Sequence, residues 1–246
     1  IVMNEVGITG KNLIIMGGNG DVGSADHNVN INIKGNLEAN SRNDIYIHQT
    51  ALDGQAANAL TLLSVAGRNI NLLADAGIQM TTENGKTMGY INGQTINLHA
   101  LGGNLGLADD GIRLLDNGAV VNAAADQGSI YLSGREAGSL VLGNIKAGAD
   151  FSIKSSGDVD QGRNEDKDAE DKVITTAVSS VLDAGNTVEI QGSNVNLVNG
   201  TIKMHKGGKT LRVTATNGAV KQEAEHEIWA DQVEIKALNG IQLDNA

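Results

Sequence analysis

Apolar and polar residues alternate along most of the chain, and the pattern is clearest between residues 69 and 80. The segment from Asn69 to Ala74 alternates with a period of two, a corner containing Gly77 follows, and the alternation resumes at Ile78. The same arrangement returns at residues 232–243. A period of two is typical of β-strands with one buried face. A strand–corner–strand unit that recurs along a chain indicates a solenoid, in which each copy forms one coil.

The spacing between copies is loose, since the interval from Ile96 to Ile130 is clearly longer than the interval from Leu211 to Val233. At roughly 20 residues per coil the sequence predicts about a dozen coils, and at ~4.8 Å per strand the rod is on the order of 55–60 Å long. Besides the two segments above, the same alternation occurs at residues 11–16, 28–33, 44–48, 59–63, 95–100, 111–114, 128–132, 150–154, 187–190, 193–197, 200–204 and 210–213.

The inward face of such a solenoid is expected to carry aliphatic side chains that stack on like side chains of neighbouring coils. The outward face is expected to carry Asn, Gln, Thr, Ser and charged residues. Asn71 and Asn97 hold matching outward positions, and they form a ladder if their strands lie side by side in register. The predicted core stack includes Ile70, Leu72, Ile96, Leu98, Ile130, Leu132, Val233 and Ile235.

One stretch interrupts the alternation, at about residues 162–178. A run of mixed charge comes first, and apolar residues at helical spacing follow it, which would fit a short helix. The β-branched residues around Ile174 favour extended structure instead. We expect a protruding charged loop and then a strand at residues 179–182. The loop is a candidate interaction surface through Arg163, Glu165, Asp166, Lys167 and Asp168.

Composition supports an all-β fold of a single kind over residues 1–246. The chain has 32 glycines and no proline, which suits many tight corners and unbroken hydrogen-bond ladders. Aromatic residues are 2% of the chain, so the core must be aliphatic. Both ends carry ordinary repeats rather than caps, and we expect the chain to be one β-helix segment of a longer protein, continued by flanking coils.

Charge and residue content narrow the classes of partner. The formal net charge is −11, which disfavours nucleic acid and anionic membranes. No apolar run approaches the roughly 20 residues of a membrane span, so membrane insertion is not expected. The absence of cysteine excludes disulfides and thiolate sites.

A family resemblance lies in the corners. Residues 180–197 combine Ala184-Gly185-Asn186, a strand, Gly192-Ser193-Asn194 and a second strand, and residues 66–72 and 92–98 are further copies. This arrangement resembles the shaft repeats of filamentous-haemagglutinin-type exoproteins, the large two-partner-secreted adhesins of Gram-negative bacteria.

The resemblance implies a right-handed parallel β-helix, secreted to the bacterial cell surface. It also implies a virulence role, in cell adhesion or in carrying a toxin at the tip. Shaft repeats of this family have no catalytic residues and no cofactor. The family's amino-terminal secretion domain carries Asn-Pro motifs, whereas this chain has no proline and therefore resembles the shaft.

Candidate metal sites are weak. The run Gly17-Gly18-Asn19-Gly20-Asp21 is similar to the calcium-binding nonapeptide of β-rolls, but its spacing is wrong and it occurs once, so we interpret it as a plain corner. Acidic residues also gather at positions 109–110, 158–160 and 166–171, where solvated carboxylates are favoured over calcium sites. His48 and His99 are expected on outward faces, two or more coils apart, and we predict no metal site.

An enzymatic function is not predicted, although polysaccharide-cleaving enzymes share the β-helix fold. Those enzymes combine carboxylates, Arg or Lys with aromatic residues that stack on sugars, and this chain has few aromatic residues. Arg113, Arg135 and Arg212 each lie near acidic residues in the sequence. No nucleophile–histidine–acid set and no phosphate loop is apparent. Trp229, the single tryptophan, is expected to cover a corner of the core rather than to anchor a partner.

The sequence therefore favours a structural shaft that holds a binding or toxic region away from the cell. The alternative is a module that binds a host receptor, a glycan or a neighbouring cell through loops at residues 161–172 or 23–27. A polysaccharide-cleaving enzyme is the third hypothesis. Each makes different use of the outward residues, because the inward ones are committed to the core.

Overall fold

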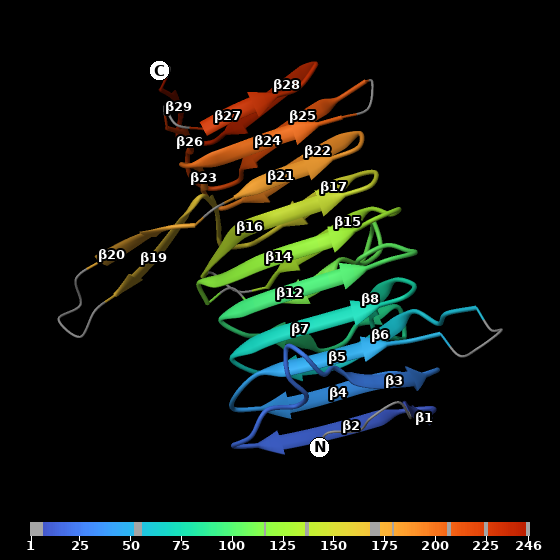
Figure 1. The fold of residues 1–246 in the computed structure, drawn as a ribbon. Helices are drawn as coiled ribbons and strands as arrows, with labels where there is room; N and C mark the ends of the chain where they lie inside the picture. Colours follow the sequence, from blue (N-terminus) through green and yellow to red (C-terminus); the bar gives the residue numbers. More distant parts are fainter. Residues whose placement is uncertain are drawn as a thin grey trace.

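The computed structural model describes residues 7–51, 56–115, 117–135, 138–167, 173–178, 180–205, 208–223 and 226–244, with the backbone alone for 163–167 and 173–177. Every regular element in these ranges is a β-strand. Two large parallel sheets run along a rod, and the chain passes back and forth between them as it climbs (Figure 1). Among the described residues no helix is long and apolar enough to cross a membrane.

Sheet A, as we name the first, has 14 strands, and each rung pairs in parallel with the next turn. Its strands are β1 (Ile8–Gly10), β3 (Val29–Ile33), β5 (Ile45–Gln49), β7 (Asn69–Ala74), β12 (Thr95–Ala100), β14 (Ala119–Ala125), β16 (Ser139–Ala147), β18 (Asp158–Gln161), β21 (Val181–Ala184), β23 (Val195–Leu197), β24 (Gly200–Met204), β26 (Val220–Gln222), β27 (His226–Trp229) and β29 (Ile241–Leu243).

Sheet B has 11 strands and lies on the opposite side of the core. Its strands are β2 (Leu13–Gly18), β4 (Asn36–Ser41), β6 (Leu60–Ala66), β8 (Ile78–Met80), β11 (Tyr90–Asn92), β13 (Ile112–Leu114), β15 (Ile130–Gly134), β17 (Phe151–Lys154), β22 (Thr187–Gly192), β25 (Thr210–Ala215) and β28 (Gln232–Ala237).

The predicted parallel β-solenoid is confirmed, with about nine turns instead of a dozen. A turn is longer than the sequence estimate assumed, because Ile70 pairs with Ile96 rather than with a residue nearer in the chain. Leu211 and Val233 do pair, but Ile96 and Ile130 belong to different sheets, so their spacing is not a period. The right-handed sense of the coil stays a prediction.

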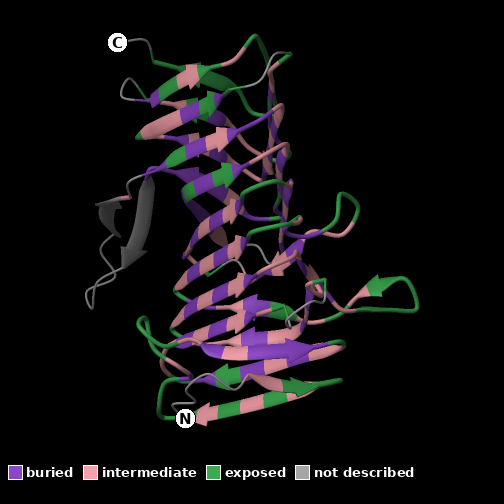
Figure 2. Cartoon of the chain, turned by 45° about the vertical axis from the view of Figure 1, so that its right-hand side comes forward, coloured by how far each residue is buried: buried purple, intermediate pink, exposed green. Residues whose placement is uncertain are grey.

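Aliphatic side chains fill the space between the sheets, as the alternation predicts. Strand β7 is typical, since its even-numbered residues are buried and its odd-numbered ones half-buried. Figure 2 shows the same alternation along the rod. The core residues Ile70, Leu72, Ile96, Leu98, Ile130 and Leu132 are all at most 3% exposed.

The two remaining residues of the predicted core stack are not enclosed. Val233 is 50% exposed, and Ile235 is half-buried against the core. Both lie in β28, the last rung of sheet B, which pairs with β25 and has no rung on its other side. The inward direction of this row is therefore the same as elsewhere, but burial needs a neighbour on both sides.

The charged stretch forms a β-hairpin instead of the expected loop. Strands β19 (Arg163–Lys167) and β20 (Val173–Ala177) pair in antiparallel register, and Figure 1 shows the hairpin projecting from the rod. The helical alternative is therefore wrong and the extended one correct. The strand expected at 179–182 begins at Val181 and ends at Ala184. Asp168 and Ser179 lie outside the described residues.

This hairpin is inserted into one rung of sheet A. Strands β18 and β21, on either side of it, both pair with β16. Val178 N donates to Gly162 O at 3.1 Å, which closes the base of the hairpin. Gly162 has a φ of +84°, and an added Cβ would overlap the backbone of Asn199. Only glycine fits where the chain leaves the rung.

Sheet B contains a second insertion of the same design. Strands β8 and β11 both pair with β6, and a small hairpin of β9 (Thr82–Glu83) and β10 (Lys86–Thr87) lies between them in sequence. The chain returns through Gly89, at a φ of +71° against the Leu63 carbonyl. The rod therefore accepts insertions inside a rung without losing register.

We predict that Leu98→Asp strongly destabilises the fold. The residue is 2% exposed, and a carboxylate there would lie unpaired among aliphatic side chains. Replacing a buried leucine even by alanine costs about 2–5 kcal/mol. Urea unfolding measures the loss, with Leu238→Asp as control because Leu238 is 71% exposed. Equal stability of the two variants would contradict the inward placement.

Candidate functional site

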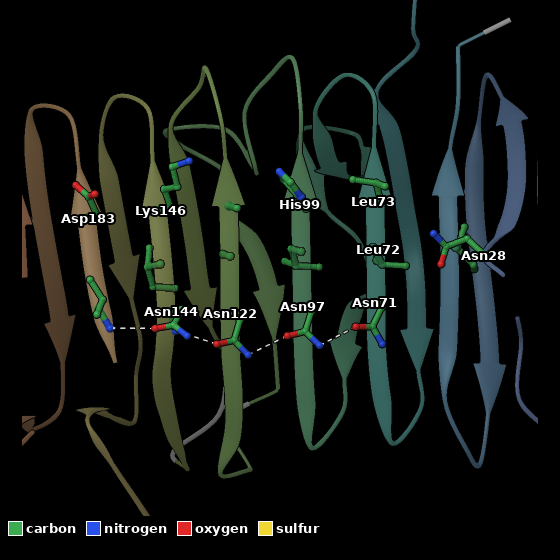
Figure 3. Close-up of a pocket in the computed structure, with 16 residues that line it drawn as sticks. Asn28, Asn71, Leu72, Leu73, Asn97, His99, Asn122, Asn144, Lys146 and Asp183 are labelled. Atoms are coloured by element: carbon green, nitrogen blue, oxygen red, sulfur yellow. Dashed lines mark hydrogen bonds between the residues drawn. The ribbon is translucent and has the colours of Figure 1, made fainter. Parts of the chain in front are cut away.

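An asparagine ladder runs along the outer face of sheet A (Figure 3). Asn97 Nδ2 donates to Asn71 Oδ1 at 2.8 Å, and Asn122 Nδ2 donates to Asn97 Oδ1 at 2.9 Å. The backbone N–H of Asn144 donates to Asn122 Oδ1 at 2.8 Å, and that of Val181 to Asn144 Oδ1 at 3.2 Å. The conditional prediction for Asn71 and Asn97 is thus confirmed, and the ladder joins five successive turns.

The ladder changes form where the register changes. Val121 pairs with Leu142 but Ala123 pairs with Ile145, so one extra residue lies opposite Asn122. This β-bulge brings the backbone of Asn144 to the Asn122 side chain. A Cβ on Gly143 would overlap Asn122 Oδ1, so glycine at this position leaves room for the amide.

A shallow groove of about 600 Å³ borders the ladder. One border is the asparagine row, and the other is the row of Leu73, His99, Ala124 and Lys146, which stack in register. The residues between the two rows point into the core, so backbone forms the floor. The groove follows directly from the pleat of a flat parallel sheet.

Histidine–aspartate pairs link neighbouring turns beside this groove. His48 Nε2 lies 2.7 Å from Asp75 Oδ1, and His99 Nε2 lies 3.0 Å from Asp126 Oδ2. Burial would raise the pKa of Asp75, but hydrogen bonds from the Ala51 N–H and from His48 outweigh it and lower the pKa. His48 and His99 are two rungs apart, as predicted, because Leu73 lies between them.

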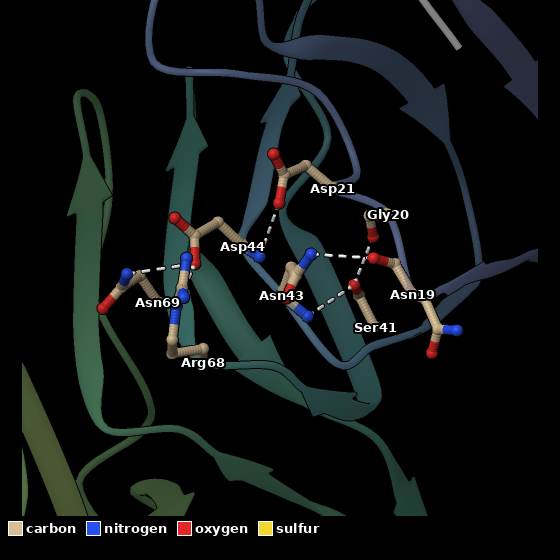
Figure 4. A network of polar contacts seen from close by, with 8 residues as sticks. All are labelled: Asn19, Gly20, Asp21, Ser41, Asn43, Asp44, Arg68 and Asn69. Carbon is tan, nitrogen blue, oxygen red and sulfur yellow. Dashed lines mark hydrogen bonds and ion pairs between the residues drawn. The ribbon is translucent and has the colours of Figure 1, made fainter.

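The corners carry a similar network (Figure 4). Ser41 Oγ donates to Gly20 O at 2.6 Å, and the Asp44 N–H donates to Asp21 Oδ1 at 3.1 Å. Arg68 Nε donates to Asp44 Oδ1 at 3.0 Å, and this bond lowers the pKa of Asp44 although burial opposes it. Asp21, the acid of the possible calcium motif, therefore stabilises the next corner.

Other residues named from the sequence have structural roles. Asp158 Oδ1 accepts two hydrogen bonds from Asn194 at 2.9 Å, and Asp160 Oδ1 accepts one from Asn196 at 2.6 Å. Arg212 pairs with Glu234 at 3.5 Å. In the described part of the chain, no three His, Cys, Asp or Glu side chains gather where they could hold a metal ion.

Three sequence expectations need a separate report. Trp229 does not cover the core, since it is 63% exposed on the outer face of sheet A. The turn at Gly23 is closed by hydrogen bonds between Ser24 and His27. For the candidate interaction residues Arg163, Glu165, Asp166 and Lys167, the structure gives the backbone of β19 and not the side chains.

A buried polar contact was not predicted. His226 in β27 is 4% exposed, and its Nε2 lies 2.8 Å from Oε1 of the fully buried Gln161. His226 Nδ1 is buried and has no hydrogen-bond partner among the described residues. Burial lowers the pKa of His226 to about 4. The two partners lie far apart in the sequence, which hides the contact from any reading of local pattern.

The chain matches no protein-family model, no curated protein and no solved structure. Function must therefore be argued from the geometry of the rod itself. That geometry consists of an aliphatic core, polar contacts between successive turns, and insertions that leave the rungs intact.

We predict that Asn97→Ala lowers stability by about 1–2 kcal/mol, because it removes two part-buried hydrogen bonds that contribute about 0.5–1.5 kcal/mol each. Chemical unfolding measures the change. Asn40→Ala, at an exposed position of β4, is the matched control for the intrinsic effect of alanine in a strand. A loss no larger than the control's would show that the ladder adds no stability.

We also predict that stability falls as the pH drops from about 6.5 to about 4. The unfolded chain protonates His226 near its ordinary pKa, whereas the fold delays protonation to about 4, so protons favour the unfolded state. The full effect is on the order of 3 kcal/mol. His226→Gln should flatten the profile, whereas His27→Gln, at an exposed histidine, should not. Parallel profiles for all three proteins would contradict the prediction.

Proposed function

We propose that this chain is a shaft segment of a secreted, bacterial cell-surface exoprotein of the filamentous-haemagglutinin type. Its function is to be long, stiff and soluble, and so to hold an adhesive or toxic region away from the cell. It acts without catalysis, in cell adhesion and virulence. Its structural partners are flanking coils of the same right-handed β-helix, which would cover apolar residues such as Val233.

The observation that carries this proposal is the continuous coupling of neighbouring turns. The core, the asparagine ladder and the corner network all join residues about one turn apart. Bending the rod would open inward packing and outward hydrogen bonds together. Stiffness is the property that such an arrangement provides, and a spacer needs little else.

A second candidate function is binding to a host receptor, a glycan or a neighbouring cell through the hairpin of β19 and β20. The specific observation in its favour is the projection of this hairpin from the rod, where it takes no part in the core (Figure 1). Its removal need not disturb the rung, because Gly162 and Val178 are already hydrogen-bonded neighbours.

Two deletions separate the candidates. Removing residues 70–95 joins Asn69 to Ile96, and since Asn69 pairs with Thr95 and Ile70 with Ile96, the splice keeps the register. A shaft should shorten by about 5 Å in small-angle scattering, one strand spacing, and still unfold cooperatively. Removing residues 70–94 is the control, because a shift of one residue turns the apolar row outward.

Removing residues 163–177 tests the hairpin. For a shaft, attachment of the fragment to host-cell monolayers and to a glycan array should stay at background with or without the hairpin. Saturable attachment that disappears with the hairpin would contradict the shaft and establish the binding module. Loss of folding on in-register removal of one coil would also contradict the shaft.

A further inference from the structure

A polar cleft of about 530 Å³ lies where two protruding segments meet on the outer side of sheet B. One segment is the small hairpin of β9 and β10. The other is a tight turn in the next coil, in which Leu107 and Asp110 exchange two backbone hydrogen bonds. The volume falls within the range of small-molecule sites. The rungs beneath do not need the cleft, because β8 and β11 pair with β6 directly.

The walls of the cleft are fixed by contacts between the two segments. The Thr87 hydroxyl donates to the Asp110 carboxylate, and an Arg113 Nη1–H donates to the Thr87 carbonyl. Arg113 pairs in register with Ser133, which places Arg135 in the adjoining rung. Thr87, Arg113 and Arg135 therefore reach the cleft from three successive coils.

Positive charge is concentrated in this cleft, although the chain as a whole is acidic. Lys86, Arg113 and Arg135 all line it. Burial lowers the pKa of Arg113, and the positive charge of Arg135 lowers it further, so the two guanidinium groups lie close enough to repel. An anion between them would relieve that repulsion and accept their N–H groups.

The two acids of the cleft do not remove this preference. Asp110 is occupied by Thr87, and burial raises the pKa of its carboxyl although Arg113 opposes that shift. Asp109 is exposed at the rim. Three cations against two carboxylates leave an excess of one positive charge, at a place where burial strengthens electrostatic interactions.

We propose that the cleft binds an oxyanion group, a carboxylate or a sulfate, carried on a small polar molecule. A planar guanidinium presents two parallel N–H groups to such an oxyanion. Arg113 and Arg135 hold the oxyanion, and Lys86 adds charge at the rim. Ser133 and Asp109 are placed to bind hydroxyl groups of the carrier. This site goes beyond the shaft function and does not depend on it.

Isothermal titration of the whole 246-residue chain tests the site with three probes. Glucuronate supplies a carboxylate on a sugar, sulfate supplies the oxyanion alone, and glucose supplies the sugar alone. We expect glucuronate or sulfate to bind, more weakly at high salt, and glucose not to bind. Displacement of glucuronate by sulfate would place both at one site.

Arg135→Gln should weaken binding by about tenfold or more, the effect of losing one charged hydrogen bond. Arg135 is exposed, so this change leaves the core intact, and Arg113→Gln is the second variant. Arg212→Gln, in β25 of the same sheet, is the control with the same charge change. Failure of both oxyanions to bind, equal binding of glucose, or unaltered binding by both cleft variants would overturn the proposal.

Discussion

The structure depends on one constraint: an aliphatic side chain of each turn is buried only by the same row of the turns before and after it. No turn has a core of its own, because two short strands facing each other enclose too little apolar surface. Parallel pairing in register is what aligns the rows, and Ile70 on Ile96 on Val121 is an example. The exposure of Val233 illustrates the constraint, since the row continues in direction but has no further rung to cover it.

The same constraint determines where new chemistry fits. A change in an inward residue disturbs two neighbouring turns, whereas a segment inserted inside a rung disturbs neither, provided that its ends lie together. Gly162 and Gly89 meet that condition at the two hairpins, because each holds a left-handed backbone pressed against the next turn. Insertions are therefore the natural places for recognition on this rod, and the cleft beside β9 and β10 lies between two of them.

The alternation of residues predicted the strands and their inward rows, because burial of one face is a local property of a β-strand. It did not predict which strands are neighbours, because turn length varies, and so the ladder at Asn71 could be stated only as a condition. Contacts such as His226 with Gln161 depend on three-dimensional placement alone. One signal was present and unused: Gly-Gly-Asn, followed directly or after a short insertion by an aliphatic residue, Gly, any residue, Ala and Asp. It occurs at residues 17–26 and 102–109, and both copies form the same tight turn after Gly23 and Gly106, each at a φ of +75°.

Parallel stacking in register also explains the abundance of outward asparagine. Residues that repeat at one position along the rod lie about 4.8 Å apart, and like charges at that spacing repel. An amide both donates and accepts, so one asparagine can follow another indefinitely, as Asn71, Asn97 and Asn122 do. Where charge does occur on this face it is paired with its opposite, as in His48 with Asp75. Arg113 and Arg135 are the exception, since two like charges lie in adjoining rungs of one sheet. On a surface otherwise organised to avoid that arrangement, their juxtaposition is the feature that most requires a ligand.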